Sequence, residues 1–271
     1  MSRRMIRGCE YFVEEAGTGL HTVIFLHGLF MSGRAWHAQA LALRNRYRCV
    51  SLDLRGHARS SAPTRGYAMP EIATDIARLI STGQYGPCHI VGCAMGATIA
   101  LHLALDRPEL VRSLTLISAT AHGDSVERKR QYQALGFAMR LIGPKLFAGR
   151  LMQNLFGQHF LRDEDRRIQV EHWHNEFCRQ DGSAMARSLR AYAQRDTLTE
   201  RVGDINIPTL VLAGERDTIC PVRESKALAD AISGARCLTS AKAAHCPPVE
   251  TPDEVSDALT GFLTSLQPRR R

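Results

Sequence analysis

The stretch Val91-Gly92-Cys93-Ala94-Met95-Gly96-Ala97 decides the fold. An apolar run at 88–91 precedes it and predicts a buried strand, and residues 98–105 after it predict a helix. Strand, turn and helix in this order are the setting of a nucleophile elbow, G-x-S-x-G. Its two glycines are required because a side chain at either flank would clash where the backbone passes close to the helix. The apex residue here is Ala94, where the pattern has Ser, Cys or Asp.

Strands and helices alternate on both sides of this stretch. Further strands are predicted at 10–15, 21–26, 47–54, 114–118, 207–214 and 235–239, and further helices at 36–43, 70–80, 224–232 and 252–266. Alternation at this spacing predicts an α/β fold with a mostly parallel, doubly wound sheet.

The alternation of strands and helices stops between 121 and about 201, where no strand-like run occurs. Four helical stretches are predicted there, at 132–142, 144–156, 163–177 and 181–192, and the third is expected to bury Ile168, Trp173 and Phe177. We therefore predict one domain whose core comprises 1–120 and 201–271. Residues 121–200 would form an inserted helical lid over the carboxyl edge of the sheet, where pockets form in open α/β folds.

Composition excludes several classes of protein. The net charge is +8 and the pI about 9.3, but basic residues are dispersed, and only Arg3-Arg4 and Arg269-Arg270-Arg271 form clusters. We interpret these as solvated tails and expect no nucleic-acid partner.

No apolar run has membrane-spanning length and the N-terminus lacks a signal peptide, which predicts a soluble cytoplasmic protein without a membrane partner. Eight cysteines without a C-x-x-C pair predict reduced thiols instead of disulfides or a metal site.

Four further motifs follow predicted strands in a fixed order. They are His27-Gly28, Asp53-Leu54-Arg55-Gly56-His57, Gly214-Glu215-Arg216-Asp217 and Ala244-His245-Cys246-Pro247. Together with the elbow they resemble the α/β-hydrolase superfamily over essentially the whole chain. The segments 101–119 and 228–245 look like its 3-oxoadipate enol-lactonase branch.

The resemblance implies a role for each motif. His245 would be the general base and Asp217 the acid that orients it, with Glu215 in the same loop as a competing acid. The backbone amides of Leu29 and Met95 would form the oxyanion hole. The loop at Asp53 is mainly structural in the family.

The resemblance also bears on the substrate. A small-molecule ester or lactone is expected, and the reaction needs no metal or organic cofactor. If the substrate is a carboxylated lactone, Arg34 would be its cationic anchor, and the alternative is an exposed surface arginine.

Ala94 leaves two interpretations open. One is a serine replaced by alanine through engineering, in a Ser-His-Asp hydrolase of esters or lactones that is nearly inactive as written. The other is a natural non-hydrolytic homologue, either a lyase that uses His245 alone or a ligand-binding pseudo-enzyme. Cys93 and Cys246 are not expected to replace the serine, because Cys93 lies one position before the apex and Cys246 faces elsewhere.

Overall fold

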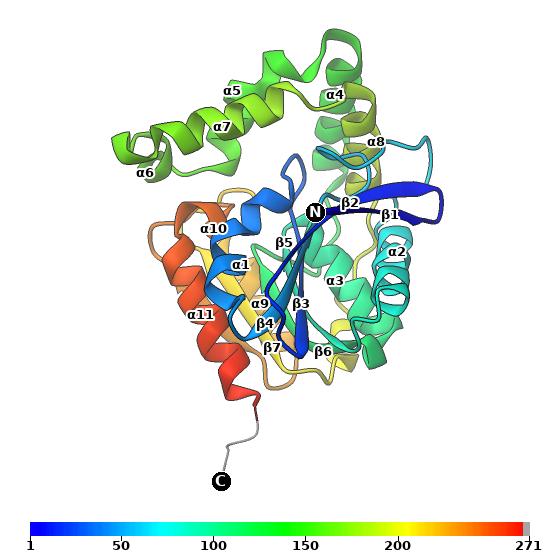
Figure 1. Ribbon diagram of the computed structural model, residues 1–271. Helices are drawn as coiled ribbons and strands as arrows, with labels where there is room; N and C mark the ends of the chain where they lie inside the picture. The colour runs from blue at the N-terminus through cyan, green and yellow to red at the C-terminus, as the bar shows by residue number, and fades with distance from the viewer. Residues whose placement is uncertain (268–271) are drawn as a thin grey trace.

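A computed structural model describes residues 1–267 and contains one eight-stranded sheet (Figure 1). The strands are β1 (Ser2–Ile6), β2 (Cys9–Ala16), β3 (His21–Leu26), β4 (Tyr47–Leu52), β5 (Cys88–Cys93), β6 (Val111–Ile117), β7 (Thr209–Gly214) and β8 (Arg236–Ser240). Their spatial order is β1-β2-β4-β3-β5-β6-β7-β8. The pairs β1–β2 and β2–β4 are antiparallel and all others are parallel. The prediction of a mostly parallel α/β sheet is confirmed.

Helices connect these strands. The α-helices are α1 (His37–Leu43), α2 (Met69–Thr82), α3 (Met95–Asp106), α4 (Val126–Ile142), α5 (Ala148–Leu155), α6 (Gln158–Leu161), α7 (Arg167–Cys178), α8 (Gly182–Ala193), α9 (Val222–Ala231), α10 (Pro247–Glu250) and α11 (Pro252–Ser265). Short 3-10 turns lie at Gly33–Trp36, Pro108–Leu110, Pro144–Phe147, Glu164–Arg166 and Val202–Asp204.

The sheet is covered on both faces, with α1 and α11 packed together on one side and α2 and α3 on the other (Figure 1). This burial explains why the central strands are mostly apolar, because a parallel strand between two helical layers has no solvated face. All six residues of β5, including His89, are buried.

The segment from α4 to α8, which we call the lid, lies beyond the carboxyl ends of the strands (Figure 1). The two chain segments that join it to the sheet are held together. The Leu198 amide donates to the Ala121 carbonyl at 2.7 Å, and Arg195 forms a buried ion pair with Asp124.

Two expectations about individual segments are wrong, and a third lies outside the described residues. The basic N-terminus forms edge strand β1 instead of a tail, because its backbone pairs with β2 while Arg3 and Arg4 point to solvent. Ile168 is 80% exposed. It lies nine residues before the buried Phe177, which at 3.6 residues per turn places it on the opposite side of α7. The expectation for Arg269-Arg270-Arg271 concerns residues beyond the described part.

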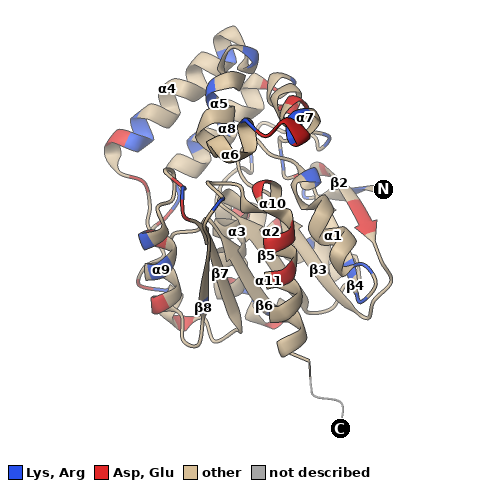
Figure 2. Cartoon of the chain, turned by 90° about the vertical axis from the view of Figure 1, so that its left-hand side faces the viewer, with Lys and Arg blue, Asp and Glu red and all other residues tan. Residues whose placement is uncertain are grey.

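Charged residues of both signs are spread over the surface (Figure 2). Within residues 1–267, no helix combines the length and the apolarity needed to cross a membrane.

Candidate active site

The sharp turn at Ala94 is the centre of the site. Ala94 joins β5 to α3 with φ 50° and ψ −110°, a strained conformation for a residue that carries a side chain. The flanking glycines permit the turn. A Cβ on Gly96 would lie 2.1 Å from the Leu26 carbonyl oxygen, and one on Gly92 would lie 2.4 Å from the Gly96 oxygen. The backbone of a nucleophile elbow is therefore complete, with a methyl group at its apex.

A histidine–aspartate pair lies beside this turn. His245 Nδ1 is 2.8 Å from Asp217 Oδ2, and Asp217 Oδ1 accepts the amides of Ile219 and Cys220, both at 2.8 Å. Burial alone would raise the pKa of Asp217. The interactions with His245 and the two amides outweigh it, and the pKa lies below its ordinary value. Because an ionised carboxylate only accepts, Nδ1 carries the hydrogen and Nε2 is left as the acceptor.

Ala94 and His245 line one cavity of about 90 Å³ at the base of the lid. Its other lining residues are Gly28, Leu29, Phe30, Met31, Cys93, Met95, Tyr132, Leu135, Leu151, Asn154, Leu155, Tyr192, Ile219 and Cys246. Most of these side chains are apolar, which suits a small, largely uncharged ligand. The cavity brings the elbow, the histidine and both expected oxyanion residues together.

The expected oxyanion residues enter the cavity from two elements. Met95 is the first residue of α3, whose first-turn amides have no partner within the helix. Leu29 follows Gly28 in the loop after β3, and a Cβ on Gly28 would meet the Ala94 Cβ at 3.5 Å. The next residue, Phe30, has φ 66°, and its carbonyl accepts from Gln180 Nε2 of the lid at 3.0 Å. A lid side chain thus holds the backbone of the loop that carries Leu29.

Glu250 fixes the histidine loop and was not assigned a role from the sequence. Its Oε1 accepts the Cys246 amide at 2.9 Å, both carboxylate oxygens lie 3.1 Å from the Ala244 nitrogen, and Oε2 accepts the Gly157 amide of the lid at 2.7 Å. The two residues that flank His245 are therefore bonded to one buried carboxylate. The H-x-x-x-x-E spacing from 245 to 250 is the sequence signal that could have indicated this role.

The two cysteines of the cavity are poor nucleophiles. Cys93 Sγ faces the carbonyl oxygen of His245 at 3.7 Å, which is not the imidazole. Burial, with a smaller contribution from nearby carboxylates, raises the pKa of both Cys93 and Cys246 well above the ordinary thiol value. Because the thiolate is the reactive form, both thiols are unreactive at neutral pH.

The remaining sequence-derived candidates lie outside the cavity. Arg34 lines a separate surface groove, where its Nη1 is 3.4 Å from His172 Nε2. Asp53 accepts the amide of Gly33, the first residue of the 3-10 turn after β3, at 2.8 Å, and it also binds Arg59. Glu215 is exposed. In the part of the chain that the structure describes, no group of three or more His, Cys, Asp or Glu side chains could hold a metal ion.

Comparison with known proteins defines the class. A family model described as "alpha/beta hydrolase fold" matches residues 21–252. The chain therefore belongs to the α/β-hydrolase family.

Individual relatives are more distant. A putative carbamate hydrolase RutD from Azorhizobium caulinodans is 27% identical over 94% of this chain and 95% of its own. The pimeloyl-[acyl-carrier protein] methyl ester esterase of Aeromonas hydrophila is 26% identical over 93% and 98%. Among solved structures, a thermophilic esterase from Thermogutta terrifontis superposes with a TM-score of 0.93 at 26% identity, covering 99% of this chain and 100% of that one. The enol-lactonase from Burkholderia xenovorans, at 22% identity, covers 97% and 100% with a TM-score of 0.90 and shares the fold.

Proposed function

We propose that the cavity at Ala94 is the site of a serine-type hydrolase of small carboxylic esters or lactones, with alanine in place of the nucleophile. The observation that carries this is the left-handed conformation of Ala94 beside an intact Asp217–His245 pair. The methyl group of Ala94 can make no hydrogen bond in this conformation. A serine hydroxyl at the same position would lie near the His245 base and two backbone amides. Two relatives, one named as a methyl ester esterase and the other as a putative carbamate hydrolase, also support hydrolysis at an acyl carbon.

With a serine at position 94 the residues would act as follows. His245 Nε2 takes the hydroxyl proton as the oxygen attacks the carbonyl carbon. The amides of Leu29 and Met95 stabilise the oxyanion. Collapse breaks the bond to the leaving oxygen, which receives its proton from His245, and water then releases the acid by the same route. Loss of the nucleophile lowers such rates on the order of a million-fold, so the chain as it stands binds substrate and scarcely turns it over.

The test compares the chain with its Ala94→Ser variant on p-nitrophenyl acetate and on an enol-lactone. We expect kcat to rise by about a thousand-fold or more, because the base, its acid and the oxyanion donors are in place. Cys93→Ser is the matched control, since it introduces a hydroxyl one residue before the apex and should give no gain.

The intact His245–Asp217 pair also supports a second candidate, acid–base chemistry by His245 without a covalent step. Activity in the unmodified chain that disappears in His245→Ala would favour it over the serine-type proposal. Ligand binding with no gain from Ala94→Ser would instead indicate a binding protein.

A further inference from the structure

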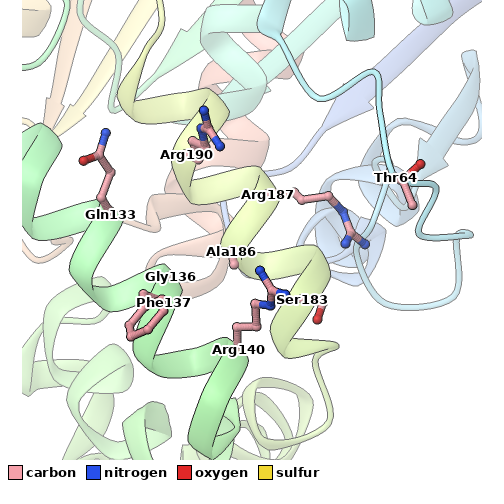
Figure 3. A pocket seen from close by; sticks show the side chains of 9 residues that line it. All are labelled: Thr64, Gln133, Gly136, Phe137, Arg140, Ser183, Ala186, Arg187 and Arg190. Carbon is pink, nitrogen blue, oxygen red and sulfur yellow. The ribbon is translucent and has the colours of Figure 1, made fainter.

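A groove lined by two lid helices is separate from the cavity at Ala94. It has a volume of about 680 Å³, lies between α4 and α8, and reaches the core at Thr64 (Figure 3). The same two helices line the active-site cavity with other residues, namely Tyr132 and Leu135 of α4 and Tyr192 of α8. At 100° per residue, Tyr132 and Leu135 lie on the side of α4 opposite Phe137, which lines the groove. The groove is thus a second concave site on the same helix pair.

Three arginines, Arg140, Arg187 and Arg190, line this groove, and none of its nine lining residues is acidic. Within residues 1–267 none of the three forms an ion pair with a carboxylate, whereas Arg195 nearby in the chain is paired with Asp124. Three guanidinium groups that line one groove without a counter-charge make the groove electropositive, and this favours a bound anion.

Arg187 is already held in position. It reaches from α8 toward the segment that carries Thr64 (Figure 3), and its Nη2 donates to the Ala62 carbonyl at 3.2 Å. Its guanidinium lies 5.3 Å from the centre of the Tyr67 ring. The buried Nε has no acceptor among the described residues. An arginine fixed in this way loses little conformational freedom when it binds an oxyanion.

The rest of the groove is uncharged, with three polar residues, Thr64, Gln133 and Ser183, and an apolar part formed by Gly136, Phe137 and Ala186. Gly136 and Ala186 meet where the helices cross, since a Cβ on Gly136 would lie 3.1 Å from the Ala186 Cα, so no long side chain fills the floor. Phe137 stands beside this crossing and is 64% exposed (Figure 3). An exposed aromatic ring next to arginines offers a surface on which a flat ring can stack.

We propose that this groove binds a small organic phosphate with an aromatic portion, of the nucleoside diphosphate class. Guanidinium groups bind phosphate oxygens in a bidentate manner, which accounts for the arginines. The ring of the ligand would cover Phe137, and the volume lies in the range of about 300–1,000 Å³ typical of small-molecule sites. The site is independent of the function proposed for the cavity at Ala94.

The test is calorimetric titration of the full chain with ADP and, separately, with inorganic pyrophosphate. Among the described residues Arg140 and Arg190 form no ion pair, so Arg140→Gln and Arg190→Gln break none there. Each substitution should weaken ADP binding about tenfold. Arg150→Gln is the matched control, because Arg150 is an exposed lid arginine outside the groove, and it should leave the affinity unchanged. Phe137→Ala should weaken the binding of ADP but not of pyrophosphate. Circular dichroism verifies that each variant is folded.

Three results would overturn the proposal. The first is that neither ADP nor pyrophosphate binds measurably. The second is an equal loss in Arg150→Gln and the groove variants, which would indicate non-specific attraction to a basic protein. The third is binding to phosphatidylglycerol vesicles through the groove arginines without binding of ADP, which would make the groove a membrane-contacting surface.

Discussion

At position 94 the neighbours, and not the residue itself, set the backbone conformation. An L-residue in the left-handed region costs about 1–3 kcal/mol, and the Ala94 side chain makes no hydrogen bond that could offset this. The close approach of Gly96 to Leu26 forces the turn instead. A serine would therefore enter a conformation that already exists, with His245 lining the same cavity.

In the Ala94→Ser background, Asp217→Asn should lower kcat on the order of ten-thousand-fold, because the amide would favour the wrong tautomer of His245. Glu215→Gln in the same loop is the control and should leave kcat nearly unchanged, since Glu215 is exposed and Asp217 makes the bond to His245. The opposite ranking of the two variants in an aryl-ester assay would assign the acid to Glu215.

The residues that the sequence could indicate are those with a fixed place in a motif. Asp217 and His245 follow from the order of motifs, and the structure brings them together. Gln180 carries no such signal, because its bond to the Phe30 carbonyl joins positions 150 residues apart. Arg34 is the opposite case, because it lies close in sequence to Leu29 and yet its side chain does not line the cavity.

At the scale of elements, one carboxylate couples the histidine loop to the lid. Glu250 binds the amides on both sides of His245 and the amide of Gly157, which directly precedes α6. Burial raises the pKa of Glu250 above its ordinary value even though these amides oppose the shift. The position of the imidazole therefore depends on a bonded network that includes the lid.

Glu250→Gln should misplace His245 without removing it. A glutamine side chain has only one oxygen acceptor, and its NH₂ group would face an amide donor. In the Ala94→Ser background we expect kcat to fall on the order of a hundred-fold with little change in KM. Asp253→Asn, at an exposed neighbouring carboxylate, should change neither value. A rise in KM at constant kcat would show that Glu250 acts on ligand binding instead of on the histidine.

Strands and helices could be predicted where their burial requires apolar residues. They could not be predicted where only backbone hydrogen bonds define the element. β5 and β3 are buried almost throughout and are mostly apolar. β1 is an edge strand with three exposed residues out of five, so nothing in its composition marks it. The exposure of Ile168 has a different cause, because the apolar residues within 163–177 do not share one helical face.

At the scale of the whole molecule, buried neutral histidines link stability to pH. Burial lowers the pKa of His57 to about 3 and that of His89 to about 4, from an ordinary value of 6.5, and also lowers that of His27. Below pH 6.5 these histidines bind protons in the unfolded chain but stay neutral in the folded chain. The folded state therefore loses stability as the pH falls from about 7 toward 4.

We expect the free energy of unfolding, measured with urea, to fall by up to about 1.4 kcal/mol per pH unit for each such histidine in this range. His89→Gln removes one titrating group and should reduce the slope accordingly, whatever its effect on stability at pH 7. His37→Gln, at an exposed histidine, should leave the slope unchanged. A free energy that is constant between pH 7 and 5 would contradict this interpretation of the core.

Covalent labelling of the Ala94→Ser variant with a fluorophosphonate tests the central claim most directly, because the label reports an activated hydroxyl irrespective of the natural substrate. If the elbow, His245 and the oxyanion amides converge as described, mass spectrometry will find one label per chain, at position 94, and it will be lost on adding His245→Ala. A folded variant that stays unlabelled, or that is labelled at another residue, would contradict the account.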